Sequence, residues 1–371
     1  MHLIDTTLRD GEQAPGVSFD FMAQLRIARE LAEFGVGEIE VRSPVRDPEG
    51  ARNLEELLHA GLGVEWLIWC RAREEDLDIA QRAGATRVHI AFPLSDRQMG
   101  TLGHDWDSAL IELEPLLRMA VRRFDFVSAG AQDASRTPIA RLHAYAQRLE
   151  EWGVVRLRLA DTLGIMTPTS VMRLCAEMHA AHPNLAIEFH GHNDLGLATA
   201  NALCALESGA SVASATVLGL GERCGNASLE QLVMALHQSG HPDIAHFHLE
   251  HTQHLCKLVA ECAHRSIPIT QPLVGADTLR HQSGIHIAGI LRDPKSYEPY
   301  PPELVGKLGH EFVLGALSGR HAIQHALEQK NLYPSASAVE MLLLLLRQRA
   351  RHQTHSVSAE DLAKMYLSLE S

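Results

Sequence analysis

The sequence has 371 residues, of which 46% are hydrophobic and 21% are charged, and its formal net charge is −13. This size and composition predict a globular protein with one large domain and an appendage. The negative charge argues against a general affinity for nucleic acid, and no apolar run is long enough to cross a membrane.

Six cysteines are scattered along the chain without CxxC spacing, which indicates reduced thiols rather than a disulfide framework or a zinc finger. They are Cys70, Cys175, Cys204, Cys224, Cys256 and Cys262. The first residues, Met1 to Asp5, lack a basic region followed by an apolar segment, so we expect no secretory signal. A soluble, cytoplasmic protein is therefore predicted.

Taken in order, apolar runs of strand length alternate with segments of helical periodicity. The expected strands are Leu3–Thr6, Glu38–Val41, Trp66–Cys70, Val88–Phe92, Phe124–Ser128, Val155–Ala160, Leu185–His190 and Val212–Val217. The expected helices include Phe21–Phe34, Glu74–Ala83, Ile139–Trp152, Thr169–Ala181 and Leu195–Ser208. Eight strand–helix units over roughly 240 residues predict an α/β protein, a (β/α)8 TIM barrel. An open doubly wound sheet is the alternative, but no GxGxxG follows the first strand.

After residue 240 the pattern changes to helices and irregular turns. Helices are expected at His254–His264, Ala322–Glu328, Ala336–Arg349 and Ala359–Leu369, and turns at Pro268–Gly289 and Pro294–Pro302. We therefore expect a catalytic TIM barrel in residues 1–240 and a C-terminal linker with a mainly helical subdomain in residues 241–371. This appendage shows little core of its own, so it is expected to pack on a barrel, its own or that of a partner subunit.

Polar residues gather where the predicted strands end, and in a barrel these ends share the catalytic face. They are Asp10, Arg42, Arg71, Asp161, Thr162, His190, His192, Glu222 and Asn226. His190 and His192 are two residues apart at the end of an apolar run, so alternation would point both imidazoles the same way. A lone His-x-His pair is more often a surface or core feature, but Asp10 would add a third ligand and leave positions open for a substrate.

Three stretches carry a family resemblance: Thr6 to Gln13, His190 to Gly196, and Gly219 to Ala227. They are similar to the isopropylmalate synthase and homocitrate synthase family, metal-dependent Claisen condensing enzymes grouped with hydroxymethylglutaryl-CoA lyase and pyruvate carboxyltransferases. The resemblance runs from Ile4 to about Gly319 and is strongest to homocitrate synthases of nitrogen-fixing bacteria. Further matching motifs are Trp69-Cys70-Arg71, Asp133-Ala134-Ser135-Arg136 and Gln271-Pro272-Leu273-Val274-Gly275.

The resemblance implies a divalent metal, Mg, Mn, Zn or Fe, that is chelated by a 2-oxo acid and acts as a Lewis acid. Arg9 matches an arginine that holds the oxo group and the acetyl thioester, and its alternative is a salt bridge to a neighbouring carboxylate. Gln13 and Glu40 match other active-site positions, although Glu40 could be purely structural. Thr162 matches a residue that hydrogen-bonds the substrate carboxylate, or it caps the next turn. Asn226 is a metal ligand or holds a metal-bound water.

The resemblance also implies a base that removes a proton from the methyl group of acetyl-CoA, the co-substrate. His286 matches this catalytic histidine and Tyr297 an assisting tyrosine, and His281 is a less secure match. In the family both reach the barrel of the neighbouring subunit, which implies a domain-swapped homodimer. Hydrolysis of the thioester then releases CoA.

Several positions depart from the family pattern. Gln132 replaces a catalytically relevant glutamate, and Arg42 replaces a glycine after Ile-Glu-Val. Gln282 and Ala316-Leu317 replace a glutamate and a Lys-His pair. The changes at 132 and 42 make the barrel mouth more positive and favour a more anionic substrate, which Arg42 and Arg71 could hold together.

Three hypotheses remain open from the sequence. The first is a homocitrate synthase that uses 2-oxoglutarate, with Arg71 on the distal carboxylate. The second is a specialised paralogue, such as a 2-phosphonomethylmalate synthase that uses phosphonopyruvate. The third is a metal-binding or regulatory paralogue that has lost condensation. A leucine-type isopropylmalate synthase is less expected, because the chain ends near residue 371 without room for a regulatory domain.

Overall fold

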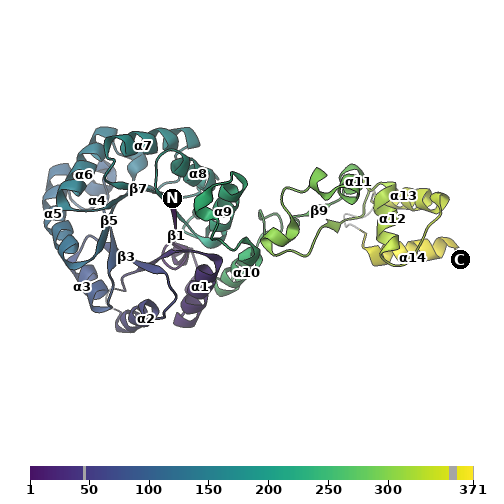
Figure 1. The fold of residues 1–371 in the computed structure, drawn as a ribbon, viewed down its shortest axis with the longest axis horizontal. Coiled ribbons are helices and arrows are strands. Elements are labelled where there is room, and N and C mark those ends of the chain that lie inside the picture. Colours follow the sequence, from purple (N-terminus) through teal and green to yellow (C-terminus); the bar gives the residue numbers. More distant parts are fainter. Residues whose placement is uncertain (45–46, 351–356, 371) are drawn as a thin grey trace. The chain divides into compact units, whose positions relative to one another are not determined.

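The computed structural model describes residues 1–44, 47–350 and 357–370. It contains two compact units, Met1–Ser266 and Ile267–Ser371. In the first unit, eight parallel strands close into a barrel in sequence order, with helices around them (Figure 1). This confirms the predicted (β/α)8 fold.

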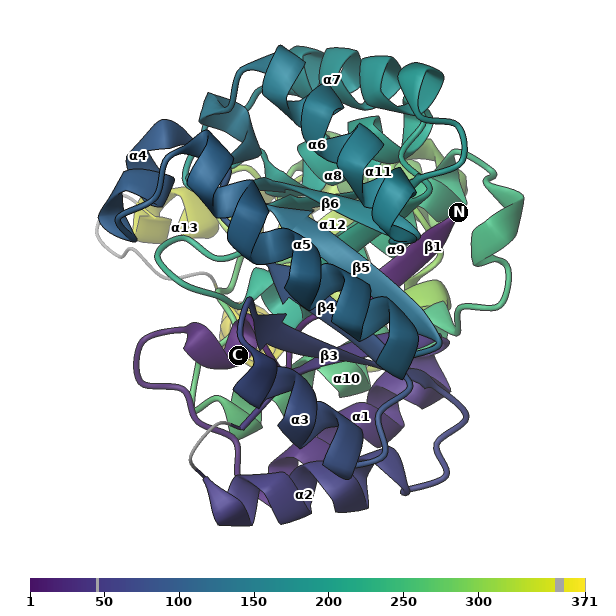
Figure 2. The same cartoon turned by 90° about the vertical axis from the view of Figure 1, so that its left-hand side faces the viewer.

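The strands and helices of this unit alternate along the chain. The strands are β1 (His2–Asp5), β2 (Glu38–Arg42), β3 (Glu65–Arg71), β4 (Arg87–Ala91), β5 (Phe126–Ala131), β6 (Arg156–Asp161), β7 (Ala186–Gly191) and β8 (Val212–Ala215). The helices are α1 (Phe21–Phe34), α2 (Pro48–Leu58), α3 (Glu74–Arg82), α4 (Asp96–Thr101), α5 (Trp106–Arg123), α6 (Ile139–Trp152), α7 (Pro168–Ala181), α8 (Ala198–Glu207), α9 (Leu229–Gln238) and α10 (Thr252–Cys262). Seen from the side, α3 packs on β3 and α5 packs on β5 (Figure 2).

Local signals explain why the sequence predicted the element ends well. Helix α1 begins where the Asp20 side chain accepts the N–H of Ala23 at 2.7 Å, and it ends at Gly35, whose φ of 108° favours glycine. Its bounds are those predicted. The predicted fifth strand began at Phe124, but Phe124 caps α5 by donating its N–H to Ala120, so β5 begins later.

Charged side chains fill part of the barrel interior. Glu38 and Glu40 of β2 bind Arg156 and Arg158 of β6, and Arg156 contacts Glu38 through two hydrogen bonds of 2.9 and 3.0 Å. Since β2 and β6 are four strands apart in a barrel of eight, these contacts cross its inside. Burial would raise the pKa of Glu38, but hydrogen bonds from His2 and Arg156 outweigh it and lower that pKa to about 2.

An apolar cluster complements this charged set. Ile4, Leu67 and Val212 are buried together, and Phe126 packs against them. The guanidinium of Arg156 lies 4.5 Å from the centroid of the Phe126 ring. The barrel interior is therefore a filled core, and it supports the residues above it at the strand ends.

The first unit continues beyond its last strand. Helix α9 follows, and α10 packs against α1. The predicted helix His254–His264 corresponds to α10, which begins two residues earlier because it continues a short 3₁₀ turn, η5 (Leu249–His251). Among the described residues, no helix is both long enough and apolar enough to cross a membrane.

The second unit has a core of its own, so the prediction that it lacked one is wrong. Its elements are β9 (Arg280–His281), α11 (Gly284–Arg292), β10 (Glu311–Phe312), α12 (Arg320–Glu328), α13 (Ala336–Ala350) and α14 (Ala359–Glu370). Ile287, Leu327, Leu342, Leu346 and Leu362 are each at most 1% exposed in one cluster. The cluster draws its side chains from α11, α12, α13 and α14, so it could not be inferred from one segment, not even from the apolar run Leu342–Leu346. Helix α11 was not predicted either.

Candidate active site

A cavity of about 350 Å³ lies where the barrel strands end. The predicted residues that line it are Arg9, Asp10, Gln13, Gln132, Thr162, His190, His192 and Glu222. They come from five different strand ends, and closure of the barrel brings them together. The structure thus gathers most of the predicted constellation in one place.

Asp10, His190 and His192 form the centre of this cavity. Their ligand atoms lie within 4.8 Å of one another, and all three side chains are buried. The Asp10 Oδ2 atom is 3.0 Å from His190 Nε2 and 3.9 Å from His192 Nε2. The two imidazole rings are nearly perpendicular, with centroids 5.1 Å apart. One oxygen and two nitrogen ligands therefore point at one spot.

The chemistry of these groups fits a divalent metal ion. Buried Asp10 Oδ2, His192 Nδ1 and Asn226 Oδ1 have no hydrogen-bond partner in the described structure. Burial lowers the pKa of His192 to about 4, so this imidazole is neutral near neutral pH, as a metal ligand must be. Burial opposes ionisation of Asp10, but the charge of Arg9 and the nearby imidazoles outweigh it and lower its pKa well below the usual value.

Asn226 adjoins His192 of this centre. It pairs with His192 as an isolated β-bridge, and its Nδ2 atom donates to the carbonyl of Leu220 at 3.0 Å. That bond fixes the amide and leaves Oδ1 free to accept. This arrangement suits a residue that orients a water next to the three ligands.

Arg9 connects the cavity to the charged barrel interior. Its Nε atom donates to the Glu40 carboxylate, and its Nη1 atom lies 3.4 Å from Asp10 Oδ2. Arg9 therefore forms salt bridges to two neighbouring carboxylates, those of Asp10 and Glu40. Glu40 is fully buried behind Arg9 and also binds Arg158, whose Nε donates to Glu188. Burial opposes ionisation of Glu40, but the charges of Arg158 and Arg9 lower its pKa.

Thr162 and Gln132 occupy one wall of the cavity. The Thr162 hydroxyl oxygen accepts the backbone N–H of Asp133 at 2.8 Å, and its own hydrogen remains available to a ligand. It does not cap the next turn, because Asp161 does so by accepting the N–H of Met166 at 2.8 Å. The backbone N–H of Gln132 donates to the backbone carbonyl of Phe92 at 2.9 Å, and this bond fixes the position of the residue.

The structure places Arg42 and Arg71 outside this cavity. Arg71 lines an adjacent pocket of about 740 Å³, which shares Trp69, Ala91 and Gln132 with the cavity. Two of its guanidinium nitrogens donate to Asp76 at 2.8 and 3.1 Å.

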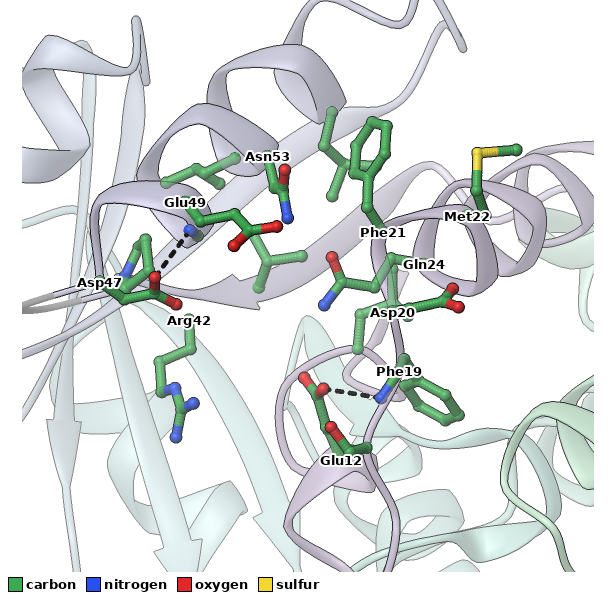
Figure 3. A pocket seen from close by; sticks show the side chains of 17 residues that line it. Glu12, Phe19, Asp20, Phe21, Met22, Gln24, Arg42, Asp47, Glu49 and Asn53 are labelled. Carbon is green, nitrogen blue, oxygen red and sulfur yellow. Dashed lines mark hydrogen bonds between the residues drawn. The ribbon is translucent and has the colours of Figure 1, made fainter.

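Arg42 lines a third pocket, of about 640 Å³, together with Glu12, Asp20, Asp47 and Glu49 (Figure 3). Arg42 and Arg71 are therefore not brought together around one small group, as the sequence suggested they could be.

His286 and Tyr297 lie in the second unit. Their rings stack with centroids 4.3 Å apart, and both side chains are exposed. His286 lies on α11, near its N-terminus. His281 is not part of this stacked pair, and its Nε2 atom lies 3.2 Å from His310 Nδ1. Within its own unit, the His286–Tyr297 pair is solvent-accessible.

Sequence reasoning missed two residues that line the cavity, His89 and Arg158. His89 is buried and its Nδ1 contacts the Ser128 hydroxyl at 3.0 Å. Burial and the charge of Arg158 lower the pKa of His89 well below its usual value, so it is a neutral hydrogen-bonding group. The available signal was a polar residue in the middle of an apolar strand, at an inward-facing position.

Comparisons with known proteins agree with this fold. A family model described as HMGL-like matches residues 1–260, and one described as homocitrate synthase post-HMGL domain-like matches residues 273–354. Homocitrate synthase 1 of Nostoc sp. is 36% identical, over 97% of this chain and 95% of its own length. The 2-phosphonomethylmalate synthase of Streptomyces rubellomurinus is also 36% identical, over 98% and 97%.

A solved structure gives the same result for the fold. The HMG-CoA lyase of Brucella melitensis superposes with a TM-score of 0.63 at 18% identity, over 71% of this chain and 98% of that one. The family models together match most of the chain, and the relatives are similar over nearly its whole length. The chain therefore belongs to the HMGL-like family, and it carries the homocitrate synthase type of domain after its barrel.

Proposed function

We propose that this protein condenses the acetyl group of acetyl-CoA with an anionic 2-oxo acid and releases CoA. The observation that carries the proposal is the buried Asp10, His190 and His192 cluster beside Arg9 in one cavity. Relatives named homocitrate synthase and 2-phosphonomethylmalate synthase support a synthase of this kind.

Asp10, His190 and His192 would hold a divalent ion, with Asn226 on an adjacent water. A mixed oxygen and nitrogen ligand set is compatible with Mg²⁺, Mn²⁺, Zn²⁺ or Fe²⁺. When bound, the ion would supply Lewis-acid polarisation of the ketone of the 2-oxo acid. The open cavity beside the three ligands has room for that small molecule.

The chain's own polar groups would orient the 2-oxo acid. Arg9 presents a guanidinium that Glu40 fixes from behind, so its donors face the cavity without rearrangement. The free hydroxyl hydrogen of Thr162 would donate to the substrate carboxylate, and Gln13 lines the same cavity. These groups favour a compact anion with an adjacent ketone.

A base is needed to take a proton from the acetyl methyl group. We assign this role to His286, assisted by Tyr297, with both supplied by a partner subunit in a domain-swapped homodimer. The new carbon–carbon bond joins the acetyl methyl carbon to the ketone carbon, and the ketone oxygen becomes a hydroxyl. Water then cleaves the thioester to a carboxylate and free CoA. The exposed, stacked His286–Tyr297 pair supports the proposal, because it is available to a second chain.

The dimer can be tested by complementation. Asp10→Asn and His286→Ala proteins should each be nearly inactive alone, because each dimer lacks either the metal ligand or the base at both sites. After mixing under conditions that allow subunit exchange, heterodimers would contain one intact site, and CoA release should recover to a substantial fraction of the native rate. Recovery no larger than the sum of the two variants would contradict the shared site, while size-exclusion chromatography would show whether dimers form at all.

The identity of the 2-oxo acid is the finer question. We propose 2-oxoglutarate as substrate, giving homocitrate, with phosphonopyruvate as the competing candidate. The 36% identity to each of the two relatives cited above does not separate them. Gln132 forms part of the wall shared by the cavity and the Arg71 pocket, so the far end of the acid would meet a neutral amide and then a guanidinium. This order of groups suits a 2-oxo acid that carries a second anionic group at its far end.

A thiol-release assay tests both levels of the proposal. Acetyl-CoA should give free CoA fastest with 2-oxoglutarate or phosphonopyruvate, and more slowly with pyruvate or 2-oxoisovalerate. Gln132→Glu should lower kcat/KM for doubly anionic acids about tenfold relative to pyruvate, because the new carboxylate would repel the second anionic group. A tenfold change corresponds to about 1.4 kcal/mol. Arg42→Gly should act in the same direction but more weakly, because Arg42 lies outside the cavity.

The outcomes are distinguishable. An unchanged substrate ranking in both variants would reject the charge argument while leaving the condensation intact. No CoA release with any of these acids would instead favour the non-condensing paralogue, which the neutral Gln132 first suggested.

A further inference from the structure

A histidine-rich segment lies outside the cavity already described. Six of the 23 histidines fall within residues 237–254. They are His237, His241, His246, His248, His251 and His254. The proposed condensation uses none of them.

Some of these histidines have local partners. His241 accepts the backbone N–H of Asp243 at 3.3 Å, and His248 Nδ1 lies 3.4 Å from Glu250. His251 and His254 differ, because they lie beside helix α1. His254 Nε2 is 3.2 Å from Glu30 Oε1.

Glu30, Glu33 and His251 form a second cluster with metal-binding geometry. One ligand atom from each lies within 4.8 Å of those of the other two. Glu30 and Glu33 are three residues apart on α1, and His251 and His254 are three apart across the start of α10. Residues at this spacing share one helical face, so Glu30 and Glu33 lie together beside His251, and His254 contacts Glu30.

The backbone holds the two pairs in place. The N–H of His248 donates to the carbonyl of Phe34 at 2.9 Å, and the Phe34 and Phe247 rings pack edge-to-face at 5.5 Å. These contacts join the end of α1 to the segment just before His251. The three ligands are therefore positioned by the fold before any ion arrives, which lowers the entropic cost of binding.

Some atoms of this cluster lack partners. Glu30 Oε2 is buried without a hydrogen bond, whereas Glu30 Oε1 lies 3.2 Å from His254 Nε2. Within the part of the chain that the structure describes, no side-chain hydrogen bond or ion pair involves Glu33. Two neighbouring carboxylates repel each other, and a bound cation would remove that repulsion and satisfy the buried oxygen.

We propose that Glu30, Glu33 and His251 bind a divalent transition-metal ion of the Zn²⁺ class, at a site separate from the barrel mouth. Two carboxylate oxygens and one imidazole nitrogen supply three ligands of a tetrahedral Zn²⁺ site, and water would fill the fourth position. Mg²⁺ and Ca²⁺ prefer all-oxygen ligands and are disfavoured here. The ion clamps α10 to α1 and stabilises the barrel unit, without a part in condensation.

The test uses the full chain with the barrel site disabled. In an Asp10→Asn/His192→Ala background, isothermal titration with Zn²⁺ should show one ion bound per chain, and Zn²⁺ should raise the thermal unfolding midpoint. Adding Glu30→Gln and His251→Asn should weaken this binding at least about 100-fold, because two of the three ligands are lost. The matched control, His248→Asn with Glu250→Gln, removes a neighbouring His–Glu pair and should leave the affinity unchanged.

Three results would overturn the proposal: no Zn²⁺ bound in the disabled background, equal binding after Glu30→Gln/His251→Asn, or an equal loss in the control. Circular dichroism of each metal-free variant confirms that it is folded. In the otherwise native protein, Glu30→Gln/His251→Asn should leave CoA release unchanged. The second metal site and the proposed condensation can therefore fail independently.

Discussion

Replacing Asp10 by asparagine should reduce CoA release about 1000-fold. The amide keeps the size of the side chain but removes the negative charge that two imidazoles and Arg9 surround. A divalent ion is worth several kcal/mol of transition-state stabilisation, and about 4 kcal/mol corresponds to three orders of magnitude in rate. Initial rates of CoA release at saturating 2-oxoglutarate and acetyl-CoA measure the effect.

Metal content and folding separate the possible causes of that loss. Elemental analysis should show that Asp10→Asn retains less metal at the barrel mouth, while its thermal midpoint without metal stays close to that of the native protein. Asp243→Asn is the matched control, since Asp243 pairs only with the chain's N-terminus at the surface and should leave both values unchanged. A rate within tenfold of native for Asp10→Asn would refute the role of this cluster.

The second large effect is expected for Arg158→Met, which should lower the free energy of unfolding by about 3–5 kcal/mol. Methionine keeps an unbranched apolar side chain but removes the guanidinium, which leaves Glu40 and Glu188 without the charge between them. Arg158 is buried between both carboxylates, and their charges raise its pKa although burial opposes this. Urea denaturation at neutral pH measures the change.

Two further variants sharpen this prediction. Arg123→Met removes a surface arginine that also binds two carboxylates, Asp78 and Glu74, and should cost no more than about 1 kcal/mol. Adding Glu188→Gln to Arg158→Met removes one uncompensated buried charge and should restore part of the lost stability. If Arg158→Met and Arg123→Met were equally mild, the interior ion network would not stabilise the barrel. A lower kcat with unchanged KM in Arg158→Met would show that the network also orients Arg9 through Glu40.

Much of the candidate site followed from strand-end positions. Asp10, Thr162, His190 and His192 were each found at the end of an apolar run, and parallel strands in a barrel bring such ends to one face. No long-range pairing had to be known for that inference. Gln132 and Arg9 were reached through the family resemblance rather than through periodicity.

The positions of the long arginine side chains could not be obtained this way. Arg71 was expected on a substrate, but the structure directs it to Asp76, only five residues later. A long side chain can reach several partners from one backbone position, and the choice depends on what the surrounding fold leaves unpaired. The same reason explains why Arg42 and Arg71 line different pockets.

The sequence by itself determined the order of strands and helices, because the periods of 2 and 3.6 residues are local properties of the chain. It also indicated several residues at the barrel mouth, among them Asp10, His190 and His192. Only the tertiary structure decided that Glu40 meets Arg158 across 118 residues, that the second unit assembles its own core, and that Glu30 and Glu33 lie beside His251. These contacts arise when the barrel closes and helices pack, and no local pattern specifies which distant side chains then become neighbours.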